Sequence, residues 1–138
     1  MASDPINLDN LTDVLAQAFI EDPLFVYCFP DADKRLALSS PTHRLLARQA
    51  LAHGRLDPLH VDGKLCGAAL WLPSASRHLG LWELLRLGGL QAVVKQGVVA
   101  SWRQIRLGEL YEKRQRELLP QPHWYLLLLG ILKAQRGK

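Results

Sequence analysis

Apolar residues near the start of the chain recur at the spacing of one helix face. They stand at intervals of one, three and four positions: Leu11, Val14, Leu15, Ala18 and Phe19. Asn10 is a suitable N-cap, because its side chain can accept a hydrogen bond from the free N–H groups of a first turn. We therefore predict a first helix that begins after Asn10 and ends near residues 22–23.

Residues 24–30 are unusually aromatic and predict a loop. Phe25, Tyr27 and Phe29 occupy alternate positions in this segment. The simplest interpretation is that the loop covers the core beneath the first two helices.

A second helix is predicted to follow this loop and to end at Gly54, since glycine is the usual residue just after a helix. It can begin at Asp31 or Asp33. Proline lacks the N–H that a helix interior needs, so we expect a break at Pro41 and a better helix from there to residue 53.

Residues 55–61 and 64–72 predict a β-hairpin. The Asp62-Gly63 pair between them favours a type I′ turn, because both turn positions need a positive φ. Gly67 indicates a bulge or the close approach of another backbone.

Two helical segments follow, over residues 79–96 and 98–118. Gly88-Gly89 weakens the first, and Gly97 is expected to separate the two. The second carries an apolar stripe that we expect to face inward: Val99, Trp102, Ile105 (or Arg106), Leu110 and Leu118. Its outer face alternates basic residues with Glu at helical spacing, which predicts a self-neutralised solvated face and not a nucleic-acid surface.

A last apolar strand begins at residue 123. The order is then a helix pair (9–54), a hairpin (55–72), a helical insert (79–119) and a strand with the start of a loop (123–138). This order predicts a single domain of the α+β (mixed α/β) class.

Composition narrows the possible functions. The 138 residues carry 17 Lys plus Arg and 13 Asp plus Glu, and this mild excess of +4 suits an anionic cofactor without indicating nucleic-acid binding. Cys28 and Cys66 are isolated, so no metal site is expected and both are predicted to be reduced thiols. We find no signal peptide and no unbroken membrane-spanning run, and we predict a cytoplasmic protein.

The final residues carry the most chemical information. An apolar strand over residues 123–131 runs into a short basic loop that contains Gly137 between Arg136 and Lys138. Glycine lets the backbone approach a ligand closely, and a strand followed by such a loop is a common way to build an anion site.

This segment resembles the fourth strand and acetyl-CoA loop of the GNAT family of N-acetyltransferases. The family's loop reads Arg/Gln-x-x-Gly-x-Gly/Ala, and Arg136 fills its first position, with both glycines expected beyond Lys138. The upstream order of helices, hairpin, helical insert and strand is also similar, although the family often has an Asp-Pro turn where this chain has residues 132–134. The resemblance covers nearly the whole chain but only the front part of a family domain.

The resemblance implies a fold and a cofactor site. The fold would be a central, mostly antiparallel sheet flanked by helices. The pantetheine arm of acetyl-CoA would pair with the backbone of the last strand at three residues: Leu129, Gly130 and Ile131. Arg136, Gly137 and Lys138 would begin the cradle for the pyrophosphate.

The resemblance also implies an acceptor site for a small-molecule or peptide amine. The aromatic segment with Phe25 and Tyr27 would form part of its wall, and His123 or Tyr125, which share a strand face, would approach the amine. Packing against the core or the helical insert is the alternative for all four. No catalytic acid or base is assigned, because the family's usual tyrosine comes later in the fold.

Two functions remain possible from the sequence. The chain is either an acetyltransferase whose activity is impaired by truncation, or a non-catalytic remnant that acts as a binding or assembly module. No nucleic acid or membrane is expected as a partner. The uncharged stretch from Leu126 to Ile131 suits burial on both faces, and without a neighbouring strand it would expose an edge through which chains can self-associate.

Overall fold

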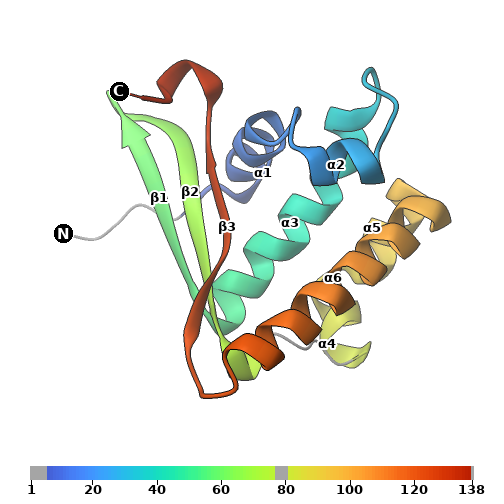
Figure 1. The fold of residues 1–138 in the computed structure, drawn as a ribbon. Coiled ribbons are helices and arrows are strands. Elements are labelled where there is room, and N and C mark those ends of the chain that lie inside the picture. The colour runs from blue at the N-terminus through green and yellow to red at the C-terminus, as the bar shows by residue number, and fades with distance from the viewer. Residues whose placement is uncertain (1–5, 77–80, 138) are drawn as a thin grey trace.

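The structure is a computed structural model that describes residues 6–76 and 81–137. Helices and strands alternate in groups along the chain (Figure 1). The elements are α1 (Leu8–Ala18), α2 (Pro23–Cys28), α3 (Arg35–His53), β1 (Arg55–Val61), β2 (Lys64–Pro73), α4 (Leu81–Arg86), α5 (Gly89–Gln96), α6 (Val98–Leu118) and β3 (Trp124–Ile131). This arrangement confirms the α+β class.

The three strands form one antiparallel sheet in the order β1-β2-β3. All the helices lie to one side of this sheet in Figure 1, and α1 and α3 pack on it directly. Alternate side chains of β2 point into the resulting core, where Ala68, Leu70 and Leu72 are almost completely buried. Ala68 and Leu70 cluster with Leu11 and Leu15 of α1, so burial of apolar surface holds the helix layer to the sheet.

The first helix begins three residues earlier than predicted. Asn7 is the N-cap, and its side-chain oxygen accepts a hydrogen bond from the Asn10 N–H at 3.1 Å. Asn10 therefore lies within the first turn. The earlier start allows Leu8 to pack against the core.

The aromatic segment is a short helix and not a loop. Asp22 caps α2 by accepting a hydrogen bond from the Leu24 N–H at 2.9 Å, and Pro23 occupies the first helical position. Asp at the N-cap followed by Pro favours the start of a helix. This local preference explains why the segment is helical where a loop was predicted.

The expected break at Pro41 is absent, because α3 runs without interruption from Arg35 to His53. An interior proline costs roughly 3 kcal/mol. His43, Ala47 and Ala50 are completely buried in the turns that follow, and their packing compensates for the lost backbone hydrogen bond. Gly54 ends the helix as predicted, with its N–H bonded to the Ala50 carbonyl.

The hairpin is confirmed in detail. Asp62 and Gly63 both have positive φ angles, 51° and 74°, as a type I′ turn requires. The close backbone approach at Gly67 is also confirmed. A Cβ placed on Gly67 would lie 2.3 Å from the carbonyl oxygen of Gly130 on β3 and 3.0 Å from the Ile131 Cα.

We therefore expect Gly67→Ala to lower the free energy of unfolding by about 2 kcal/mol, because the added methyl must push two backbones apart. Urea denaturation followed by circular dichroism would measure it. Gly108→Ala on α6, where a Cβ meets open space, is the control and should stabilise by up to about 1 kcal/mol. A Gly67→Ala protein as stable as the parent would contradict the predicted clash.

The helical insert is divided by two glycines with positive φ angles. Gly88 (98°) separates α4 from α5, so the first predicted helix is two helices, and Gly97 (92°) separates α5 from α6 as predicted. The beginning of the predicted insert, residues 79–80, lies outside the described residues. Polar contacts join the insert to α3, among them the hydrogen bond between His53 Nε2 and Glu83 Oε1 at 2.5 Å and the Thr42–Gln104 hydrogen bond at 2.6 Å.

The apolar stripe on α6 was predicted to face inward, and this is wrong. All five of its residues are more than half exposed: Val99, Trp102, Ile105, Leu110 and Leu118. The buried residues of α6 are the small Ala100 and Ser101, which let the helix approach α2 and α5 closely. The charged face does pair with itself, as in Arg116–Glu112 at 3.3 Å.

Candidate functional site

The end of the sheet where β3 terminates contains a cavity of about 600 Å³. Its walls are the last residues of β3, the connection from α1 to α2, and the loop that follows β3. The lining residues are Gln17, Ala18, Phe19, Ile20, Glu21, Asp22, Leu129, Gly130, Ile131, Lys133 and Arg136. Four of the six residues predicted to bind a cofactor thus line one cavity.

The backbone of β3 borders this cavity along an open edge. β3 is the last strand of the sheet that the described residues form. The Leu132 N–H bonds to the Cys66 carbonyl of β2 at 2.8 Å. Since backbone groups alternate in direction along a strand, those of Gly130 also face β2, and those of Leu129 and Ile131 face outward.

Arg136 joins the two walls of the cavity. Its Nε donates to the Ile131 carbonyl at 3.1 Å and its Nη2 donates to the Ala18 carbonyl at 2.7 Å. The first bond agrees with the outward direction of the Ile131 carbonyl. The second engages a carbonyl group at the C-terminal end of α1, where carbonyl groups lack partners within the helix. The guanidinium is therefore fixed at the cavity by uncharged acceptors.

The other charged side chains of the cavity include two acids. Lys133 pairs with Glu21 at 3.4 Å across the cavity, and both side chains are largely exposed. Asp22 is engaged as the cap of α2. These carboxylates reduce the attraction that Arg136 and Lys133 would exert on an anion.

Gly130 allows α1 to pack directly on the strand. A Cβ at this position would lie 2.6 Å from Phe19 Cε2 and 3.3 Å from the Ala18 Cβ. The structure thus gives this glycine a packing role that the sequence did not indicate. The contact holds the end of α1 against β3 and so forms the floor of the cavity.

Phe25 is partly buried in an aromatic cluster next to this floor. Its ring stacks on His43 with centroids 4.5 Å apart, and it also contacts Phe19 at 5.6 Å and Phe29 at 6.5 Å. His43 is completely buried, and neither of its ring nitrogens has a hydrogen-bond partner among the described residues. Burial lowers the pKa of His43 to about 4.

Tyr27, the other aromatic residue of α2 predicted to bind substrate, is half exposed and faces α6. The Arg103 guanidinium lies over its ring at 5.0 Å and donates to its carbonyl at 2.9 Å. Cys28, the next residue, is buried, which raises the pKa of its thiol although Arg103 acts in the opposite direction. Tyr27 therefore helps to attach α6 to α2.

His123 lies just before β3 and Tyr125 is the second residue of that strand, and their ring centroids are 6.2 Å apart. His123 Nδ1 lies 2.8 Å from the Gln121 carbonyl, and its Nε2 is buried without a partner among the described residues. Tyr125 precedes Leu129 by four positions, or about 13 Å of strand. Neither residue lines the cavity.

The structure thus brings the predicted cofactor residues together but separates the predicted acceptor residues into two places. Gly137 is exposed, has a φ of 75° and follows Arg136 without lining the cavity, and Lys138 lies outside the described residues. No pattern in the sequence pointed to residues 17–22 as part of this cavity. Only the free carbonyl groups at the end of α1 could have indicated that an arginine would bind there.

The comparisons with known proteins add no relative. No family model matches the chain, and no curated protein matches it. Within residues 6–76 and 81–137, no three His, Cys, Asp or Glu side chains gather in a way that could hold a metal ion. None of the helices in the same ranges combines the length and apolar character needed to cross a membrane.

Proposed function

We propose that this chain forms the acetyl-CoA-binding part of a GNAT-type N-acetyltransferase, which moves an acetyl group from acetyl-CoA to a primary amine. The observation that carries the proposal is the cavity of about 600 Å³ along the open edge of β3, closed at one end by Arg136. A cavity of this volume is within the range of small-molecule sites.

The open strand edge suits the pantetheine arm. Its two amides present donors and acceptors in the manner of a peptide, so it can add to a sheet edge as an extra strand does. The outward groups of Leu129 and Ile131 would bind these amides. Arg136 and Lys133 of the loop that follows β3 would face the pyrophosphate, because charge-assisted hydrogen bonds are the strong ones.

The acetyl end would lie toward the middle of β3. The pairing of β3 with β2 shifts register between Leu126 and Leu128, and such a bulge bends a strand and redirects its groups. An amine that attacks the thioester there needs N–H donors for the developing oxyanion and a base for its proton. Phe25, Tyr27, His123 and Tyr125 stay predictions for the acceptor side, and no residue is assigned as the base.

We expect this chain to bind acetyl-CoA weakly, with a dissociation constant above about 100 μM. The two carboxylates of the cavity oppose the pyrophosphate, and a micromolar ligand needs about 8 kcal/mol of binding free energy in total. Amide chemical shifts recorded during titration with acetyl-CoA detect such binding. The largest changes should fall on residues 17–21 and 129–137.

Two variants give this titration its control. Arg136→Ala should abolish the shifts, whereas Arg114→Ala, which removes an exposed arginine of α6, should leave them unchanged. Shifts that map to other residues, or no shifts at millimolar acetyl-CoA, would refute the proposal. A low-micromolar constant would refute the weak affinity alone.

A second candidate is the assembly module without catalysis. The observation that favours it is the same open edge, on which Trp124, Leu126 and Leu129 are 59%, 41% and 57% exposed. A strand from another chain could occupy this edge in place of the pantetheine arm.

A further inference from the structure

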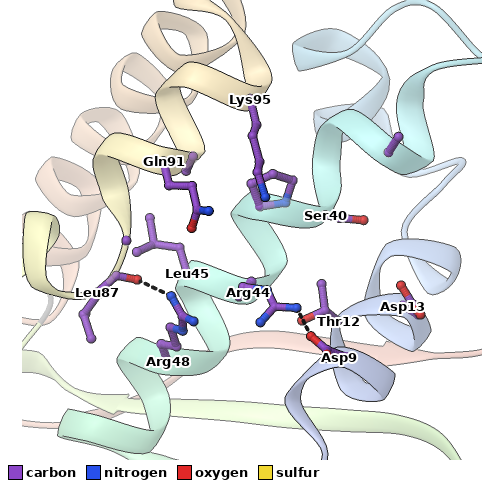
Figure 2. A pocket seen from close by; sticks show the side chains of 14 residues that line it. Asp9, Thr12, Asp13, Ser40, Arg44, Leu45, Arg48, Leu87, Gln91 and Lys95 are labelled. Atoms are coloured by element: carbon purple, nitrogen blue, oxygen red, sulfur yellow. Dashed lines mark hydrogen bonds and ion pairs between the residues drawn. The ribbon is translucent and has the colours of Figure 1, made fainter.

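A second cavity lies between α1, α3 and α5, apart from the open edge of β3 (Figure 2). Its volume is about 320 Å³, at the lower limit of small-molecule sites. Each helix contributes residues from one face, at spacings of three and four positions. They include Asp9, Thr12 and Asp13 from α1, Ser40, Arg44 and Arg48 from α3, and Gln91 and Lys95 from α5.

The charges of this cavity are separated by helix. The carboxylates all stand on α1, and the three cations stand on α3 and α5: Arg44, Arg48 and Lys95. Arg44 forms an ion pair with Asp9, which neutralises one charge of each sign. Two cations, Arg48 and Lys95, and one carboxylate, that of Asp13, are then left in the cavity. The side formed by α3 and α5 is therefore positive.

Arg48 is held in place by the turn between α4 and α5. Its Nη1 donates to the Leu87 carbonyl at 3.1 Å. A Cβ on the next residue, Gly88, would lie only 2.8 Å from the same Nη1, so the turn fits closely around the guanidinium. An arginine has five N–H donors, and this contact engages one of its nitrogens, so further donors are left for a ligand.

Lys95 of α5 supplies the second cation of the positive side. Figure 2 shows its side chain extending from α5 toward α3. It has no ion-pair or hydrogen-bond partner among the described residues, whereas most charged side chains on α1 and α3 have one. Gln96, the next residue, bonds to Gln104 and to Thr42 of α3, which fixes this end of α5 against α3.

We propose that this cavity binds a small oxyanion, a carboxylate or a phosphate, between Arg48 and Lys95. A planar guanidinium presents paired donors that match both groups, and an ammonium on the facing helix supplies the second charge. The ligand would connect α5 to α3 and would therefore stabilise the attachment of the helical insert to α3. The proposal is independent of acetyl transfer, because no residue of this cavity lines the one beside β3.

Thermal unfolding in sodium succinate and in sodium phosphate tests the proposal, with sodium chloride at equal ionic strength as the reference. We expect a saturable rise in melting temperature with at least one of the two salts. The salt with the lower apparent dissociation constant identifies the preferred oxyanion. A rise that continues linearly with concentration is a general salt effect and would overturn the proposal.

Three exposed substitutions locate the site without disturbing the core. Lys95→Gln should raise the apparent dissociation constant about tenfold, the effect of losing one charge-assisted bond. Asp13→Asn should lower it, because a carboxylate that repels the ligand is removed. Lys113→Gln on α6 is the matched control and should leave it unchanged. Saturable binding that Lys95→Gln does not weaken would place the anion elsewhere and refute the assignment.

Discussion

Lowering the pH from 7 to 4 is expected to reduce the free energy of unfolding by about 3 kcal/mol through His43 alone. This side chain is completely buried between the rings of Phe25 and Phe19, at centroid distances of 4.5 and 5.7 Å. Neither ring nitrogen has a partner among the described residues, so nothing there compensates a positive charge.

The sign follows from the two pKa values. The pKa of His43 is about 4 in the folded protein, because burial disfavours the charged form, and it returns to 6.5 when the chain unfolds. Above pH 6.5 both states are neutral and His43 contributes no pH dependence. Between pH 6.5 and 4 only the unfolded state binds the proton, so stability falls as the pH falls, and the loss levels off below pH 4.

Urea denaturation at several pH values between 7 and 4 measures this loss. Carboxylates also titrate toward the lower end of the range, so the difference between the parent and His43→Leu isolates the histidine. The variant should lose about 3 kcal/mol less than the parent over this range. His60→Gln changes an exposed histidine of β1 and should keep the dependence of the parent. Parallel curves for the parent and His43→Leu would show that His43 is not the cause.

Features with a strict local requirement were predictable from the sequence. Asp62-Gly63, Gly54 and Gly97 each occupy a turn or helix end, and the structure has a turn or helix end at all three. The local signal failed where packing decided the outcome. Pro41 lies within an unbroken helix because the following turns are buried in the core.

The helical insert shows the second reason for failure. An apolar stripe predicts a buried face only if another element lies against it, and periodicity cannot say whether one does. On α6 the small Ala100 and Ser101 make the contact, and Trp102 stays 58% exposed. Residue order alone could not show which side of α6 faces α2.

Only the residues of the candidate site that lie close together in the sequence could be predicted. Leu129, Gly130, Ile131 and Arg136 lie close in the sequence, so strand and loop geometry brought them together. Residues 17–22 reach the same cavity because Phe19 packs on Gly130, a contact between segments more than 100 positions apart. The apolar run from Leu126 to Ile131 suits burial on both faces of the strand. This expectation was wrong, since the Leu129 side chain is 57% exposed.

The chain is expected to self-associate through β3. The two edges of the sheet differ in their protection. β1 carries Arg55, Asp57 and His60 and contains Pro58, and all of these oppose strand addition. β3 has no charged side chain and no proline. Arg136 covers the Ile131 carbonyl, so pairing should use the first half of β3, from Trp124 to Leu128.

Light scattering coupled to size-exclusion chromatography measures this association over micromolar to millimolar concentrations. The mass should rise above 15.5 kDa with concentration, and Leu126→Lys should restore the monomer, because a charge on an edge strand blocks addition. Leu59→Lys is the matched control: Leu59 is as exposed as Leu126, at 41%, but lies on the protected edge, so the assembly should persist. If Leu126→Lys still associates, the exposed apolar face of α6 is responsible instead of β3. A parent chain that stays monomeric at the highest concentration means that the open edge of β3 does not bind a second copy.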